Sequence, residues 1–271
     1  MATSTQWQLS RAAAESYEAV LVPAILGPAA HALVDRANPR NAEAVLDAGC
    51  GTGAATREAA HRVGPQGRVT GVDVNPGMIA VAGSLPVPAG SAPIDWRVGS
   101  AAALPVDDAG VDLVICAQAL QFMDDPAMVA REMRRVLEPG GRVAVSTWSA
   151  LSRNPYFDAL VDALAAHIST DAANGLKSAF SLSEEDRLCA PFSGAGFRDI
   201  GVFEIAFDVR LPPMIKFIPE HAGATPLADA FAAIPETVRM TIVTDVARRL
   251  DAAVDDEVET TFRTHVLIAY R

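Results

Sequence analysis

Stretches of apolar residues alternate with amphipathic stretches along about the first 150 residues, and this alternation predicts strands and helices in turn. The expected elements are strands over 43–48, 68–73, 94–98, 111–116 and 141–147, helices over 52–63, 76–83 and 126–137, and a short helical turn near 101–103. Strands separated by helices in this way are typical of a parallel sheet that is wound with helices on both faces through right-handed crossovers. The sequence therefore predicts an α/β fold with a Rossmann-like, doubly wound sheet.

The two flanks of this region follow a different pattern, with prolines inside helical stretches. Residues 10–37 read as helices broken by Pro23 and Pro28. The later expected elements are helices over 154–170 and 184–192, a strand over Asp199–Val209, a mostly helical, proline-punctuated stretch over 212–254 and a last strand over Thr260–Tyr270. About forty residues between two final strands are too many for a hairpin loop. We expect them to form an insertion that covers the substrate.

These patterns predict one large domain with a helical cap. The expected parts are N-terminal lid helices over 1–42, the Rossmann-like core over 43–210, a helical cap insertion over 211–258 and a final strand of the core sheet over 259–271. The sheet is expected to be mostly parallel with one antiparallel strand. With 271 residues, of which 50% are hydrophobic, the chain is long enough to bury one large core.

The segment from Val45 to Gly53 reads Val-Leu-Asp-Ala-Gly-Cys-Gly-Thr-Gly, an apolar run that leads into an acid and three alternating glycines. This pattern predicts a buried strand that turns abruptly into a helix. Glycine adopts positive φ without a Cβ penalty and lets a ligand approach the backbone closely. The helix that begins near Thr52 directs free N–H groups and its positive dipole end toward the turn. We therefore expect the turn to be a ligand cradle.

A second strand, over 68–73, ends in Asp73, twenty residues past Gly53. In a Rossmann-like βαβ unit, an acid at this position contacts ribose hydroxyls. The two strand ends together predict a nucleoside-binding site. A dinucleotide fingerprint has the spacing G-x-G-x-x-G, whereas this chain has D-x-G-x-G-x-G, in which Asp47 is the acid. The spacing therefore favours a nucleoside other than a dinucleotide.

The charge of the chain bears on its partners. The formal net charge is −11, and the 22 basic residues are scattered, so no basic stripe exists that follows a phosphate backbone. Nucleic acid is therefore not an expected substrate. The first residues lack a basic segment followed by an apolar one, and each apolar stretch is expected to fall short of a membrane span. We expect a cytoplasmic protein.

Three cysteines, Cys50, Cys116 and Cys189, have neither C-x-x-C nor histidine spacing. We expect reduced thiols and no metal site. A catalytic or arsenic-binding cysteine set is the lesser alternative.

Five blocks of sequence at matching spacing resemble the methyltransferase type 11 group of the class I S-adenosylmethionine (SAM) methyltransferases, which includes the ubiquinone and menaquinone biosynthesis C-methyltransferases. The blocks are Val45–Gly53, Gly71-Val72-Asp73 with Met78, Gly99–Pro105, Cys116–Phe122 and Arg135–Gly141. The resemblance runs from about Tyr17 to the C-terminus and is strongest over 43–148. It implies SAM as the cofactor, methyl transfer as the reaction and a small-molecule methyl acceptor as the partner.

The resemblance also implies a set of cofactor contacts. The glycines hold the methionyl end, Asp47 lies near the sulfonium and amino groups, and Asp73 accepts from both ribose hydroxyls. In such proteins the block at 99–101 normally reads Gly-Asp-Ala, so Ser100 is expected to contact adenine through its hydroxyl and backbone instead. The cofactor-binding candidates are Tyr17, Asp47, Gly49, Cys50, Gly51, Thr52, Gly53, Asp73, Val74, Met78, Ser100, Ala101, Ala117 and Gln118. A core role for Met78 and a solvated loop position for Gln118 are the alternatives.

The acceptor pocket is expected where the fourth and fifth strands end and the cap closes over them. The substrate-binding candidates are Gln121, Phe122, Trp148, Arg153, Asn154 and Tyr156. Their apolar and aromatic character favours a small hydrophobic acceptor such as a quinone, phenol or polyketide-like metabolite. Ordinary core positions for Phe122 and Trp148 are the alternative. No catalytic residue is assigned, because the cofactor brings the reactive methyl group and a base is needed only if the acceptor must lose a proton.

Two other functions stay open at this point. A nicotinamide-dependent oxidoreductase shares the layout of strands and acids, but this chain lacks its glycine spacing and a Tyr-x-x-x-Lys pair. A SAM-binding protein without turnover is the second alternative. The pattern is compatible with C-, O- and N-methylation and with any oligomeric state.

Overall fold

The computed structural model describes residues 10–271; the first nine residues, on which the expectation about a leader segment rests, lie outside the described part. Its centre is a seven-stranded sheet in the order β3-β2-β1-β4-β5-β7-β6. The strands are β1 (Ala44–Ala48), β2 (Arg68–Asp73), β3 (Ile94–Val98), β4 (Val111–Ala117), β5 (Leu137–Trp148), β6 (Arg198–Leu211) and β7 (Val258–Tyr270). Strands β1 to β5 are parallel, and β7 pairs antiparallel with both β5 and β6. The predicted doubly wound α/β fold with one antiparallel strand is confirmed.

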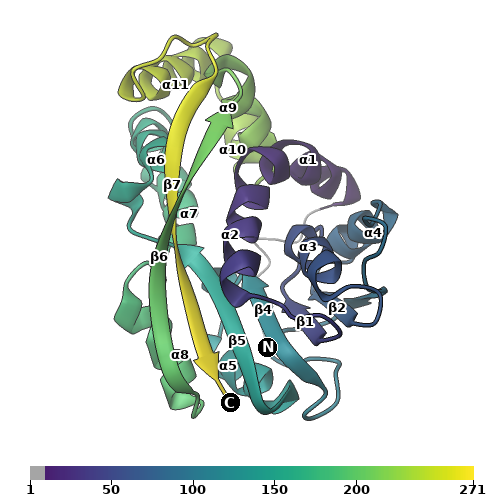
Figure 1. The fold of residues 1–271 in the computed structure, drawn as a ribbon. Coiled ribbons are helices and arrows are strands. Elements are labelled where there is room, and N and C mark those ends of the chain that lie inside the picture. Colours follow the sequence, from purple (N-terminus) through teal and green to yellow (C-terminus); the bar gives the residue numbers. More distant parts are fainter. Residues whose placement is uncertain (1–9) are drawn as a thin grey trace.

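Helices cover both faces of this sheet (Figure 1). They are α1 (Arg11–Leu21), the π-helix η2 (Val22–Leu26), α2 (Gly27–Ala37), α3 (Ala54–Val63), α4 (Pro76–Ser84), α5 (Pro126–Val136), α6 (Pro155–His167), α7 (Thr170–Lys177), α8 (Glu185–Gly194), α9 (Met214–Gly223), α10 (Ala228–Ala232) and α11 (Glu236–Arg249), with short 3-10 turns η3 (Leu120–Phe122), η4 (Leu151–Arg153) and η5 (Ser178–Phe180). Helices α2 and α3 share one buried core with the sheet, and α5 and α8 share another on the opposite face.

The N-terminal helices are not broken at Pro23 and Pro28, as the sequence predicted, but form one continuous helix from Arg11 to Ala37. The physical reason is the π-helical turn, in which the Gly27 N–H donates to the Val22 carbonyl five residues earlier. A Cβ on Gly27 would lie 2.8 Å from that carbonyl oxygen, so glycine permits the wide turn. Because each proline lies in the first turn of its segment, its missing N–H does not interrupt the helix.

This continuous helix also corrects the expectation about membrane-spanning length. Among the described residues it is the one helix that is long and apolar enough, by length and composition alone, to cross a membrane. In its most apolar window, 44% of the residues are buried inside the protein. The core helix of a protein can have this length and apolar composition without crossing a membrane, and α2 has the buried face of a core helix.

Several element boundaries differ from the predicted ones. Helix α5 ends at Val136, and β5 begins directly at Leu137 rather than after the glycine pair. The helix expected over 154–170 consists of α6 and the start of α7. Strands β6 and β7 are slightly longer than predicted. Past the last β5–β7 pair, Trp148–Thr264, they continue as a two-stranded ribbon that ends at the Leu211–Val258 pair. Figure 1 shows this ribbon rising to the cap helices.

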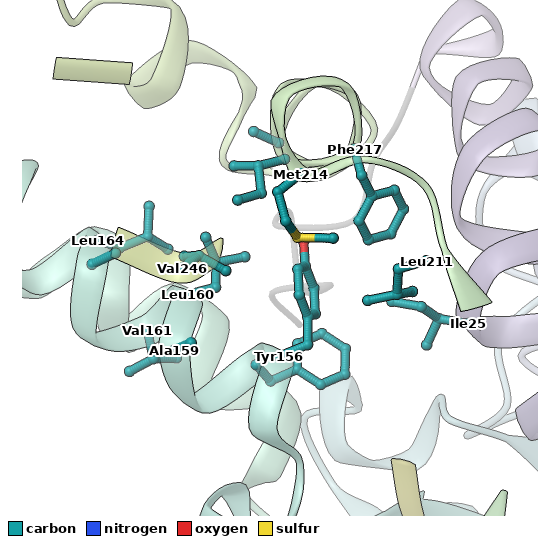
Figure 2. Packing of buried hydrophobic residues seen from close by; sticks show 14 of the residues in the cluster. Ile25, Tyr156, Ala159, Leu160, Val161, Leu164, Leu211, Met214, Phe217 and Val246 are labelled. Atoms are coloured by element: carbon teal, nitrogen blue, oxygen red, sulfur yellow. The ribbon is translucent and has the colours of Figure 1, made fainter. Parts of the chain in front are cut away.

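The cap has one continuous apolar core, which α6, α9, α11, the ribbon and the N-terminal helix all share. Figure 2 shows Ile25, Tyr156, Leu211, Met214 and Phe217 lying toward one another from four of these elements. The ring of Trp148 lies 5.3 Å from that of Phe157 and 5.7 Å from that of Phe262, between centroids. The N-terminal helix therefore connects the cap core with the sheet.

Candidate cofactor and acceptor site

The three glycines after β1 all have positive φ, but they serve two different purposes. A Cβ on Gly49 would lie 2.7 Å from the Ala119 Cβ, and one on Gly53 would lie 2.3 Å from the Trp96 ring. These two glycines allow close contact between neighbouring segments. Gly51, with a φ of 54°, has no atom within 4 Å of its Cβ position. The turn therefore presents open backbone at Gly51, as a ligand cradle requires.

Asp73 closes one side of this turn from the end of β2. Its carboxylate accepts from the backbone N–H of Gly51 and from that of Asn75, each at 2.8 Å. Burial raises the pKa of the Asp73 carboxyl, although these N–H donors act in the opposite direction. Burial also raises the pKa of the Tyr17 hydroxyl, and the negative charge of Asp73 adds to that shift. The partly buried Tyr17 packs against the cluster of Ala14, Met78 and Val81.

Asp47 lies at the end of β1 and is fully buried. One of its oxygens accepts from the Thr56 hydroxyl at 2.6 Å, and the other, Oδ1, has no hydrogen-bond partner in the protein. Burial raises the pKa of the carboxyl to about 7, and the nearby Asp73 charge contributes. A buried acid with a free oxygen is stabilised in its ionised form by a cation or by a hydrogen-bond donor.

The N-terminal helix adds a third acid, Glu18, which the sequence did not single out. Glu18 forms a 3.1 Å ion pair with Arg57, whose other guanidinium nitrogen donates to the Thr52 carbonyl at 2.6 Å. The second Glu18 oxygen is buried without a partner. The helix α1 is thereby tied to the glycine turn, next to the backbone groups of Cys50 and Thr52. Three acids, Asp47, Asp73 and Glu18, therefore surround the turn, and the Arg57 guanidinium lies beside Glu18.

The residues predicted for adenine lie on the β2 and β3 side of the site. Met78 is buried and packs with Ala14 and Val81, so it is both a core residue and a neighbour of α1. Val74 is 42% exposed, and the Ser100 hydroxyl accepts from the Ala102 N–H. Ala101, the remaining candidate here, is half-buried.

Gln118 lies at the carboxyl end of β4, beside Ala117, and the structure places its side chain in a polar chain rather than in solvent. Its φ of 51° is unusual for a residue other than glycine. The side-chain Nε2 donates to the Thr264 hydroxyl at 2.8 Å, and Oε1 accepts from Gln121 Nε2 at 3.3 Å. Gln121 is therefore brought together with Gln118 and with β7.

The other acceptor candidates lie in several different surroundings. Trp148 and Tyr156 are buried in the cap core, and Tyr156 shares a 2.7 Å hydrogen bond with His221. The side-chain amide of Asn154 hydrogen-bonds to the backbone of Ala150 and Arg263, so it holds these segments together. Arg153 forms a 2.8 Å ion pair with Glu204 and is half exposed. Phe122 follows Gln121 in η3 and is partly buried.

The residues present fit SAM, since open backbone at Gly51 lies beside three carboxylates, two of which have buried oxygens without partners in the protein. SAM is positively charged at its sulfur and at its amino group, and its ribose presents two hydroxyl donors. Asp47 and Glu18 suit the charges, and Asp73 suits the ribose.

Comparison with known proteins agrees with this geometry. A family model described as a methyltransferase domain matches residues 46–145. The ubiquinone/menaquinone biosynthesis C-methyltransferase UbiE of Rubrivivax gelatinosus is 30% identical over 208 residues, which cover 73% of this chain and 78% of that protein. The nocamycin O-methyltransferase of Saccharothrix syringae is 32% identical over 119 residues, which cover 44% of this chain and 42% of that one. The chain spans less than half the length of several curated relatives that it matches.

Solved structures support the fold. A phosphoethanolamine N-methyltransferase 2 of Haemonchus contortus, crystallised with SAM, superposes with a TM-score of 0.61 at 19% identity, covering 98% of this chain and 58% of that one. At this identity the likeness concerns the fold alone. The sequence relatives decide the family, and they confirm the predicted resemblance. The chain belongs to the SAM-dependent methyltransferases, the family whose cofactor is S-adenosylmethionine.

Proposed function

We propose that this protein transfers a methyl group from SAM to a small hydrophobic or aromatic metabolite by in-line displacement. The observation that carries the proposal is the set of three acids around the open Gly51 backbone. When bound, SAM supplies an activated methyl group on a positively charged sulfur. The chain then has to bind that cation, orient it and exclude water.

Within this proposal, each part of the cofactor has its own residues. Asp73 accepts from the ribose hydroxyls with the acceptor capacity that its two backbone bonds leave free. Asp47 and Glu18 surround the positive end, while Tyr17 covers it from α1. The adenine lies near Val74, Met78, Ser100 and Ala101, and the methionyl end lies along Gly49, Cys50, Gly51, Thr52 and Gly53, bordered by Ala117 and Gln118.

The acceptor lies, in this proposal, between Gln121 and the aromatic side chains at the base of the cap. The Trp148 ring stacks on Phe180 at 6.5 Å and lies 6.4 Å from Phe207, between centroids. Such a wall excludes water and suits a flat apolar molecule. The names of the relatives span several acceptors, arsenite and malonyl-acyl-carrier protein among them. Those that refer to ubiquinone/menaquinone biosynthesis and to nocamycin support a quinone-, phenol- or polyketide-like class.

Alignment rather than acid–base chemistry supplies most of the rate in this proposal. Holding nucleophile, methyl carbon and sulfur in line contributes on the order of 7–11 kcal/mol. We assign no general base. His221 is a poor one, because burial lowers its pKa to about 4 and its Nδ1 is bonded to Tyr156.

The division into lid helices (1–42), core (43–210), cap insertion (211–258) and final strand (259–271) also stays a proposal. The shared cap core supports joint closure of the N-terminal helix and the insertion. Residues 27–37, however, pack on the sheet, so only the part before them is expected to move. A cytoplasmic location belongs to the same proposal, in keeping with three free cysteines and no disulfide among the described residues.

The test uses the full chain and radiolabelled SAM. The panel contains phenols, hydroquinones, polyketide-like aromatics, amines and oligonucleotides. We expect label transfer to at least one of the phenols, hydroquinones or polyketide-like aromatics, and none to oligonucleotides. The Gly51→Val variant is the matched control and should transfer no label. Transfer to amines alone would contradict the proposed acceptor class, and SAM binding without transfer to any acceptor would contradict the enzymatic function.

A further inference from the structure

The buried polar chain that joins β4 to β7 has a fixed direction. The Thr147 carbonyl can only accept, and it accepts from the Thr264 hydroxyl at 2.8 Å. The hydroxyl also lies 3.3 Å from the His265 carbonyl, which is an acceptor too. Because a hydroxyl has one proton and both carbonyls can only accept, the remaining neighbour of Thr264 must be a donor. That donor is the Gln118 amide nitrogen, at 2.8 Å from Thr264 Oγ1.

The direction of this first bond decides the next one. With its nitrogen toward Thr264, Gln118 presents its Oε1 to Gln121, and that oxygen accepts from Gln121 Nε2 at 3.3 Å. Reversing either amide would put two acceptors or two donors face to face. This series of hydrogen bonds therefore ends at the side-chain carbonyl oxygen of Gln121. That oxygen is buried and has no partner in the protein, and only 9% of the Gln121 residue is exposed.

The segment that carries Gln121 lies between the cofactor turn and the aromatic wall. Ala119, two residues before Gln121, packs against Gly49 of the glycine turn. On the other side, the Ser181 hydroxyl donates to the Gln121 backbone carbonyl at 3.2 Å, next to Phe180 and its stacking partner Trp148. Leaving an amide oxygen buried without a donor is costly, so a bound molecule that brings a donor is favoured there.

We propose that Gln121 Oε1 selects methyl acceptors that carry a hydrogen-bond donor, such as a phenolic or enolic hydroxyl, on an otherwise apolar body. This inference rests on the proposed function and narrows its substrate class. Gln121 is in this role a specificity-determining residue, and Gln118 and Thr264 are positioning residues that hold its amide in one orientation.

The experiment compares 2-naphthol with 2-methoxynaphthalene, which has the same ring system but no donor, as ligands of the full chain saturated with S-adenosylhomocysteine. Calorimetry should find 2-naphthol bound at least about tenfold more tightly by the parent chain. In Gln121→Met, which keeps the volume and removes the oxygen, the two affinities should lie within about twofold. Thr264→Val, which frees the amides to turn, should give an intermediate preference.

The outcomes separate this inference from the function on which it rests. A parent chain that prefers neither naphthalene, or binds neither, overturns the role of Gln121, and so does a Gln121→Met variant that keeps the parent preference. In all of these cases S-adenosylhomocysteine binding stays intact. Loss of S-adenosylhomocysteine binding by the parent chain itself would instead overturn the proposed function.

Discussion

The glycine turn and the cap core are built in opposite ways. At the turn, Gly51 is open and the acids around it keep unpartnered oxygens, so the region is incomplete without a ligand. In the cap, the aromatic side chains are closed on one another, and even the buried Tyr156 and His221 satisfy each other. The turn is therefore organised for binding the cofactor, and the interior of the cap core for stability. Substitutions in the two regions should separate these properties.

The largest expected effect is the loss of SAM binding in Gly51→Val. The new side chain fills the open space at the turn, so affinity should fall by more than about a thousandfold. The backbone φ of 54° makes a β-branched residue unfavourable by roughly 1–2 kcal/mol, so the variant should still fold. Calorimetry with SAM and chemical denaturation measure the two quantities.

Gly53→Ala is the matched control for this variant. Its Cβ would meet the Trp96 ring, so the free energy of unfolding should fall by about 2–4 kcal/mol, more than in Gly51→Val. Equal SAM affinity in Gly51→Val and the parent chain would show that the turn is only a structural connection.

Trp148→Ala should have the reverse effect. The indole is 3% exposed and packs against several aromatic rings, so its removal should lower the free energy of unfolding by about 3–5 kcal/mol. SAM affinity measured at low temperature should change less than about threefold. A stable variant with weakened SAM binding would break the distinction between the two regions.

Asp73→Ala should weaken SAM binding by roughly 2–3 kcal/mol, because the carboxylate makes charged hydrogen bonds to the ribose. The variant also leaves the Gly51 and Asn75 N–H groups without this acceptor, so we expect a loss of about 1 kcal/mol in the free energy of unfolding. Calorimetry that finds parental affinity would rule out the ribose contact.

The last expected effect is a pH dependence that Asp47 confers, which changes SAM affinity only a few-fold. Its folded pKa of about 7 exceeds the ordinary value of 3.8, so the native state binds more protons than the unfolded state between about pH 4 and 7. The free energy of unfolding contributed by this group is therefore lost as pH rises through that window. SAM, as a cation, prefers the ionised acid, so its affinity should rise a few-fold from pH 6 to 7.5. Asp47→Asn should flatten both curves; unchanged pH profiles would exclude this role.

The glycine turn could be predicted from the sequence because the residues that form it lie close together along the chain. The segment Val45–Gly53 and the acid Asp73 lie at the ends of adjacent parallel strands, and their spacing alone predicts a nucleoside site. The parallel pairing of the first five strands was likewise predicted from the alternation of strands and helices, whereas the order of the strands comes from the structure. The π-helical turn could not be predicted from the sequence, because only the close approach of Gly27 to the Val22 carbonyl explains why the helix tolerates two prolines.

Long-range contacts account for the residues that sequence reasoning missed. Glu18 reaches Arg57 across 39 positions, and Gln118 reaches Thr264 across 146. The Trp96 ring lies against Gly53 of the turn only because β3 lies next to β2 in the sheet. None of these pairs has a local pattern. The cap core is likewise drawn from many separate elements, so it appears in the sequence only as scattered apolar positions.

The central claim is that the glycine turn holds SAM, and a crystal structure with S-adenosylhomocysteine tests it most directly. We expect the ribose hydroxyls within hydrogen-bond distance of the Asp73 carboxylate, the amino group beside Asp47 or Glu18, and the methionyl backbone against Gly51. A ligand bound elsewhere on the chain, or one at the turn whose ribose lies away from Asp73, would contradict the account.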